Sequence, residues 1–209
     1  MFTGFQDIDL FFQHGLDGKH IVLAGHPGTG KTTLALSMAI NIALDGYSVA
    51  YLSLDGKADA LSLQADIMVF KELRHGKINI KFYDVGRRGE ISRRYGESVV
   101  FIDGIKKQNN PRFNFPAASV ALIVSVIEIQ VPDRLCKMPI ISDLPVELSS
   151  LADAVLFLHN RNAIIAKNDG GPVGIAALEY VEKYIFREYP EFGNCYIEKY
   201  RAFKDKNLI

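Results

Sequence analysis

The chain has 209 residues, of which 48% are hydrophobic and 23% charged, and this balance is typical of a globular domain that buries its core without disulfides. Basic and acidic residues both number 24, so the bulk charge does not indicate nucleic-acid binding, although a local basic patch is compatible with it. The apolar runs are far shorter than the roughly 20 residues of a membrane-spanning helix, and the first residues lack a signal-peptide pattern. Cys136 and Cys195 have no metal-ligand spacing. We expect a soluble, cytoplasmic protein with no membrane partner.

The first half of the chain alternates apolar strands with helices. Residues 20–24 predict a buried strand, and residues 31–44 predict a helix that ends at a glycine. The other elements predicted in this half are strands at 47–54, 78–83 and 98–102 and helices at 58–74 and 90–95. This alternation predicts an α/β fold with a mainly parallel sheet flanked by helices.

The second half contains mostly strands. Residues 104–116 are rich in Asn, Pro and basic residues and predict a loop, and residues 137–144 look irregular. The strands predicted here lie at 119–129, 153–158, 163–167 and 173–181, with one or two helical turns at 146–151. The last two strands flank a turn and predict an antiparallel hairpin at one edge of the sheet. We predict a single domain over 1–209, with its core at about 3–186 and a C-terminal extension at 187–209.

A glycine-rich loop lies between the first strand and the first long helix. Gly25, Gly30, Lys31 and Thr32 satisfy the pattern Gly-x-x-x-x-Gly-Lys-Thr of a phosphate-binding P-loop (Walker A). Glycines let the backbone N–H groups face the phosphates, the lysine reaches the β- and γ-phosphates, and the threonine hydroxyl binds Mg²⁺. We therefore predict an ATP and Mg²⁺ site whose cofactor-binding residues are Gly25, His26, Pro27, Gly28, Thr29, Gly30, Lys31, Thr32 and Thr33.

Two aspartates end apolar strands and are candidates to complete this site. Asp103 follows the strand at 98–102, and we expect it to be a metal ligand at the end of a strand neighbouring the loop. Asp55 follows the second strand and is the best placed candidate to activate water. For both residues the alternative is a turn or helix cap.

The sequence resembles the C-terminal motor domain of replicative DnaB-type helicases, which are RecA-like P-loop ATPases. The resemblance covers residues 3–186 and is carried by the loop at 21–35, the strands at 51–55 and 99–103, and the segments at 126–134 and 164–174. It implies a RecA-like core, ATP hydrolysis, a homo-oligomeric ring such as a hexamer, and single-stranded DNA as a partner. It also implies that residues 164–174 are the hairpin that enters the site of a neighbouring subunit.

The chain departs from the family pattern at several positions. The family has a glutamate where this chain has Asp55, and its γ-phosphate-sensing glutamine corresponds to Gln130 or to the next position, Val131. The hairpin lysine is present as Lys167, but the arginine finger two residues later is Asp169, so another cation such as Arg161 would have to replace it. The resemblance implies catalytic roles for Lys31, Asp55, Gln130 and Lys167.

The segment between the second strand and the strand at 98–102 is shorter than in the family, and so is the segment at 104–118. We therefore expect a compact motor core without an N-terminal helical domain. Lys106, Lys107 and Arg112 lie in the predicted loop after Asp103, near two phenylalanines, where basic and aromatic side chains could hold single-stranded DNA. The alternative is a solvated loop that the phenylalanines anchor.

Three functions are compatible with the sequence. The first is an ATP-driven ring motor on single-stranded DNA, a hydrolase of DNA replication. The second is an ATP-binding regulatory or assembly module with little or no hydrolysis. The third is another RecA-like ATPase of recombinase or circadian-clock type. Asp55 and Asp169 favour the second function over the first, whereas the hairpin at 164–174 favours the first two over the third.

Overall fold

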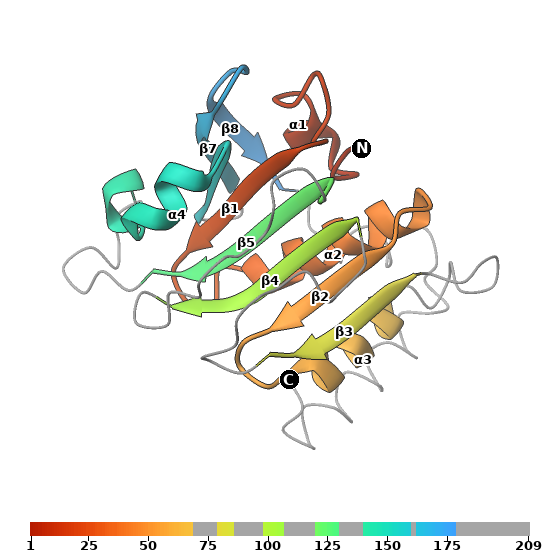
Figure 1. Cartoon of the computed structure of the whole chain (residues 1–209). Coiled ribbons are helices and arrows are strands. Elements are labelled where there is room, and N and C mark those ends of the chain that lie inside the picture. The colour runs from red at the N-terminus through yellow and green to blue at the C-terminus, as the bar shows by residue number, and fades with distance from the viewer. Residues whose placement is uncertain (69–78, 86–97, 107–119, 130–139, 160–161, 179–209) are drawn as a thin grey trace.

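The computed structural model describes residues 1–68, 79–85, 98–106, 120–129, 140–159 and 162–178. Its described strands form one sheet in the order β3-β2-β4-β5-β1-β6-β7-β8 (Figure 1). The strands are β1 (Lys19–Gly25), β2 (Val49–Ser53), β3 (Ile80–Asp84), β4 (Val99–Lys106), β5 (Leu122–Glu128), β6 (Ala154–His159), β7 (Asn162–Asn168) and β8 (Gly174–Ala177). Strands β1 to β6 pair in parallel, and β7 and β8 add antiparallel pairs at one edge. The sheet predicted from the sequence is thus confirmed.

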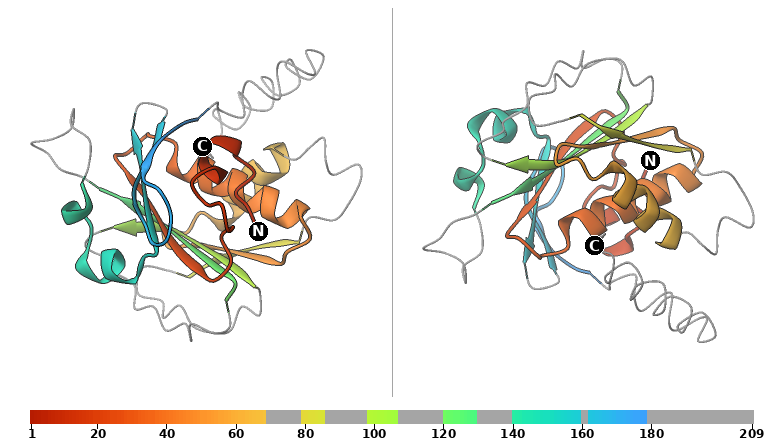
Figure 2. Two further views of the ribbon diagram at one scale, coloured as in Figure 1. Left: turned by 90° about the horizontal axis from the view of Figure 1, so that it is seen from above. Right: turned by 90° about the horizontal axis from the view of Figure 1, so that it is seen from below.

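Helices cover both faces of the sheet (Figure 2). The helix α2 (Lys31–Leu44) and the helix α3 (Ala58–Met68) lie on one face, and the 3-10 helix η5 (Ile141–Asp143) and α4 (Val146–Leu151) lie on the other. Because β1 is covered on both faces and paired on both edges, residues 21–25 are all buried. None of the described helices is long and apolar enough to cross a membrane.

Several elements differ from the sequence-based expectation. Strand β4 does not end before Gly104 but continues to Lys106, and its pairing with β5 shifts between Ile102 and Ile105. Gly104 has a positive φ of 88°, so the glycine that indicated a loop instead allows a β-bulge within a strand. The segment expected to be irregular contains η5, where the Asp143 carboxylate accepts a hydrogen bond from the Ile140 N–H. The helix predicted at 90–95 and the end of that at 58–74 lie outside the described residues.

Hydrogen bonds join the amino-terminal segment and α1 (Gln6–Asp9) to the core. The Asp9 carboxylate accepts hydrogen bonds from the N–H and hydroxyl of Thr3, at 2.7 Å each, and Thr3 is fully buried. The Thr3 carbonyl in turn accepts from the Asn41 side chain of α2 at 3.0 Å. Thr3 and Asp9 therefore form a local hydrogen-bond network that packs on α2, the helix that follows the glycine-rich loop.

Lowering the pH below about 6.5 should destabilise the protein through His20. Its Nε2 lies 2.8 Å from the Ser125 hydroxyl, and burial lowers its pKa to about 4, with Asp153 acting in the opposite direction. Between pH 6.5 and 4 the unfolded state binds a proton that the folded state excludes, so stability rises with pH in this window. The contribution lost by pH 4 is about 3 kcal/mol.

Denaturant unfolding at several pH values measures this effect. His20→Gln should flatten the slope of unfolding free energy against pH between 6.5 and 4, and His14→Gln, which replaces an exposed histidine, should keep the wild-type slope. Equal slopes for His20→Gln and the wild type would show that another group causes the dependence.

Candidate nucleotide-binding site

The glycine-rich loop joins the carboxyl end of β1 to the first residue of α2. Gly28 and Gly30 have φ values of 76° and 87°, in the left-handed region that favours glycine. A Cβ on Gly25 would lie 2.8 Å from both the Leu158 carbonyl and the Thr29 hydroxyl, so this position also requires glycine. The conformation of the loop therefore depends on its glycines, as the sequence pattern predicts.

Lys31 points back into the loop. Its ammonium donates a hydrogen bond to the His26 carbonyl at 2.7 Å, and the Thr29 hydroxyl donates to the same oxygen at 2.9 Å. Lys31 is only 8% exposed. Burial lowers the pKa of its ammonium, and the nearby carboxylates of Glu128 and Asp103 oppose that shift. A buried cation is thus held at the mouth of the loop, where an anionic ligand would compensate its lost hydration.

The first turn of α2 offers donors for an anion. Gly30 is its N-cap, and no side chain caps this end of the helix. The first N–H groups of a helix have no partner within the helix and carry a partial positive charge. Thr32 and Thr33 are both half-buried in this turn. Backbone donors, Lys31 and two hydroxyl groups therefore gather at one end of the sheet, and this combination suits a polyphosphate.

Asp103 lies beside this turn, although β4 is not the immediate neighbour of β1. Strand β5 lies between them, which corrects the expectation of an adjacent strand. The Asp103 carboxylate nevertheless accepts a hydrogen bond from the Thr32 side chain, and its Oδ1 accepts from the Gly104 N–H at 2.7 Å. Burial raises the pKa of Asp103, and these hydrogen bonds act in the opposite direction. The structure thus brings together the two residues predicted to bind Mg²⁺, and both offer oxygen atoms.

Asp55 follows β2 and lies against β4. Its Oδ2 is 3.7 Å from the ammonium of Lys106, and a Cβ on Gly104 would come within 3.1 Å of its Cγ. The Asp55 Oδ1 is buried without a hydrogen-bond partner. Lys106 lies within β4 and faces Asp55, which corrects its predicted place in a loop after Asp103. A carboxylate with a free acceptor atom therefore lies beside a cation at this end of the sheet.

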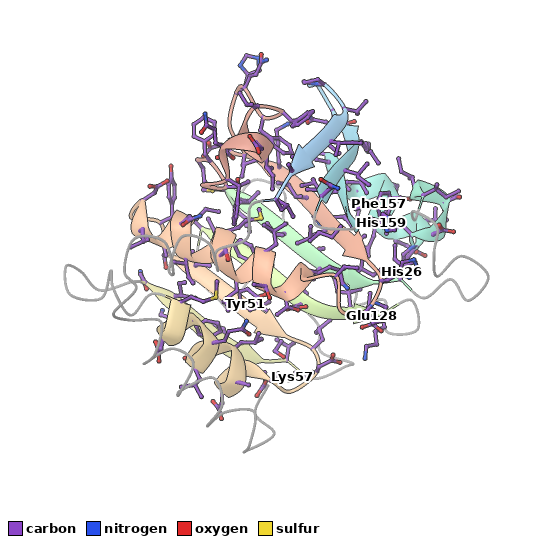
Figure 3. All side chains as sticks on the ribbon, turned by 180° about the vertical axis from the view of Figure 1, so that it is seen from behind. His26, Tyr51, Lys57, Glu128, Phe157 and His159 are labelled. Atoms are coloured by element: carbon purple, nitrogen blue, oxygen red, sulfur yellow. The ribbon has the colours of Figure 1, made fainter. Side chains whose placement is uncertain are left out.

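Glu128 is a residue of this region that the sequence analysis missed. It lies at the end of β5 (Figure 3), where it pairs with both Gly25 and Lys106. Its charge opposes the lowering of the pKa of Lys31 by burial. The signal was present, because an acidic residue follows an apolar run there just as Asp103 does. The resemblance instead implied a role for Gln130, which lies two residues after Glu128. Gln130, Lys107 and Arg112 lie outside the described residues, so their predicted roles stay predictions.

Lys167 lies far from Lys31 in its own chain. Leu158 pairs with Gly25 at the loop end of the sheet, whereas Lys167 pairs with Val155 and Lys19 contacts the Asp169 carbonyl at the other end. The Lys167 ammonium donates to the Ala152 carbonyl and lies 3.4 Å from the Asp169 carboxylate. This end of β7 therefore lies at the end of the sheet opposite the chain's own glycine-rich loop.

Several buried polar atoms in and beside the loop have no hydrogen-bond partner within the described residues. His26 is only 7% exposed, yet both of its ring nitrogens lack a hydrogen-bond partner. Buried polar atoms without partners are uncommon in folded proteins. Together with the free Asp55 Oδ1, they leave unsatisfied polar groups in the loop and beside it. The residues present fit a nucleotide with a divalent cation.

The family described as "DnaB-like helicase C terminal domain" matches residues 1–109, which include the glycine-rich loop and Asp103. The chain belongs to this family. The match confirms the resemblance drawn from the sequence.

Two solved structures share the fold of this chain. The first, described as an ATPase domain, superposes with a TM-score of 0.66 at 20% identity, covering 87% of this chain and 88% of that one. The second is a DnaB-like replicative helicase, described with its interactions with primase, and superposes with a TM-score of 0.63 at 21% identity, covering 86% of this chain and 60% of that one. The RecA-like fold predicted from the sequence is thereby confirmed.

A curated relative matches a shorter stretch. The DNA repair protein RadA of Campylobacter jejuni is 37% identical over 65 residues, which are 31% of this chain. The chain spans only 15% of the length of that relative. The chain therefore shares one segment with this relative, and the two solved structures match most of the chain.

Proposed function

We propose that this DnaB-like core binds ATP with Mg²⁺ on residues 25–33. The observation that carries the proposal is the convergence of Lys31, Thr32 and Asp103 at the amino end of α2. Lys31 would neutralise the β- and γ-phosphates, and Thr32 and Asp103 would hold the cation. The chemistry that a bound Mg²⁺ would supply at these residues is a reduction of the negative charge on the phosphates.

We further propose that the chain hydrolyses ATP slowly. Asp55 is the candidate to orient water and accept its proton, and its free Oδ1 supports this role. Its side chain is one methylene shorter than the glutamate of the family, and Lys106 competes for its other oxygen at 3.7 Å. The shorter side chain should reduce its reach, and the contact with Lys106 occupies one of its two oxygens, so turnover should be weaker than in a motor that carries glutamate.

The proposed assembly is a homo-oligomeric ring, for which a hexamer is the expected size, acting on single-stranded DNA. The placement of Lys167 and Asp169 at the opposite end of the sheet from Lys31 supports a site shared between subunits. We propose a single ATPase domain over 1–209, with Gln130 completing the site and Lys107 and Arg112 contacting DNA. An ATP-binding module with little turnover is the second candidate, and the Asp55–Lys106 pair and Asp169 favour it.

Phosphate release from ATP, measured with and without a single-stranded oligonucleotide beside the mass in solution, tests these proposals. DNA-stimulated turnover by a hexamer is the expected result for the motor. Tight ATP binding with no turnover in either condition would reject the motor and support the module. Asp103→Asn is the matched control, because it keeps the size of the side chain but removes its charge, and it should abolish any turnover that depends on Mg²⁺.

A further inference from the structure

Tyr51 of β2 contacts the predicted metal ligand from inside the core. Its side chain is fully buried, and its hydroxyl donates a hydrogen bond to the Asp103 Oδ2 at 3.0 Å. The ring stacks on Phe101, with centroids 5.6 Å apart and planes 4° apart, and tilts against Phe82 at the same centroid separation. Two aromatic neighbours thus fix the ring that carries the hydroxyl group.

The sheet register explains how this contact forms. Tyr51 pairs with Phe101 and Ser53 pairs with Asp103, so Tyr51 and Asp103 are diagonal neighbours. Tyr51 lies on the face that α2 covers (Figure 3). Long side chains reach such diagonal positions in a sheet. Apart from Tyr51 and Ser53, the residues of the strand at 49–53 are aliphatic. A buried tyrosine usually has a hydrogen-bond partner for its hydroxyl, so Tyr51 indicates a polar contact inside the core.

Each oxygen of the Asp103 carboxylate therefore has a donor in its own domain. Oδ1 accepts from the Gly104 N–H and Oδ2 from Tyr51, while Thr32 also contacts the group. A carboxylate held in this way cannot rotate freely about its Cβ–Cγ bond. Residues that orient a metal ligand from outside the coordination sphere commonly change metal affinity about 10- to 100-fold when they are removed.

We propose that Tyr51 is a positioning residue for the Mg²⁺ site, whose hydroxyl holds the Asp103 carboxylate in the orientation that binds the cation. The inference rests on the proposed function, since it concerns the same ATP and Mg²⁺ site. The competing explanation is that Asp103 only satisfies a buried tyrosine hydroxyl. That explanation predicts a change in stability alone, whereas a positioning role changes the dependence of nucleotide binding on Mg²⁺.

Tyr51→Phe separates these explanations, because it keeps the ring and its stacking and removes only the hydroxyl. The measurement is the affinity for a fluorescent ATP analogue, first in EDTA and then across a titration with Mg²⁺. We expect unchanged affinity in EDTA and a Mg²⁺ midpoint raised about 10-fold. Tyr47→Phe, just before the amino end of β2 and away from Asp103, is the matched control and should keep the wild-type midpoint.

An unchanged Mg²⁺ midpoint in a folded Tyr51→Phe protein would overturn the inference. If that variant does not fold, 3-fluorotyrosine placed only at position 51 gives a second measurement. Its ¹⁹F signal should shift when Mg²⁺ is added to the complex with the analogue, and a signal that does not move would overturn the inference. Failure of the proposed function gives a different result, in which the wild type itself shows no effect of Mg²⁺ and Asp103→Asn changes nothing.

Discussion

Replacing Lys31 by alanine is expected to weaken ATP binding about 100-fold or more. Lys31 is 8% exposed, and its ammonium is held at the mouth of the loop by a hydrogen bond to the His26 carbonyl. A hydrogen bond to a charged group contributes about 1.5–3 kcal/mol, so losing contacts to two phosphates should cost about 3–6 kcal/mol. A 100-fold weaker affinity corresponds to about 2.8 kcal/mol, so it is the lower bound of this effect. Alanine is also favourable at the start of a helix, so α2 should remain folded.

The measurement is equilibrium binding of ATP in the presence of Mg²⁺. Lys81→Ala is the matched control, because it removes the same charge from an exposed position on the edge strand β3. It should bind ATP as the wild type does. Equal ATP affinity of Lys31→Ala and the wild type would contradict the assignment of the loop.

Replacing Asp169 by arginine is expected to raise ATP hydrolysis at least about 10-fold in the oligomer, because an arginine finger contributes about 10³–10⁵ in rate in related reactions. The resemblance to the helicase family places such an arginine at the position of Asp169. Asp169 is exposed, and its backbone N–H bonds to the Asp153 carbonyl at 2.8 Å, so the hairpin should keep its shape. The substitution also frees Lys167 from its ion pair at 3.4 Å.

Asp169→Asn separates the two effects of this change. It releases Lys167 without adding a cation, so its hydrolysis rate should lie near the wild-type rate or slightly above it, as expected for an exposed ion pair of small energy. Both variants are compared by phosphate release at a concentration where the oligomer is present. No gain for Asp169→Arg in the oligomer would contradict the interpretation that a missing arginine at this position limits hydrolysis.

Much of the site could be predicted from the sequence, because local rules decide its structure. The spacing of Gly25, Gly30 and Lys31 determines a loop between a strand and a helix, and the predicted helix at 31–44 has the same bounds in the structure. The apolar run before Asp103 likewise predicted a strand that leads to the site. These features depend on neighbouring residues, and a single sequence shows them.

Other features depend on strand order, which local patterns do not show. The placement of β5 between β1 and β4 brings Glu128 beside Lys31, and it could not be read from the spacing of either residue. Gly104 looked like the start of a loop but lies in a bulge, because pairing with β5 continues beyond it. The contact between Tyr51 and Asp103 likewise requires the register of two strands, since the residues are 52 positions apart. Tertiary pairing decided each of these cases.

The central claim is tested most directly by titrating the wild-type protein with ATP, first in the presence of Mg²⁺ and then in EDTA. We expect saturable binding of one ATP per chain, with an affinity that falls when EDTA removes the cation, because Lys31, Thr32 and Asp103 act on one ligand. Absence of saturable binding in both conditions would contradict the assignment of residues 25–33 as a nucleotide site.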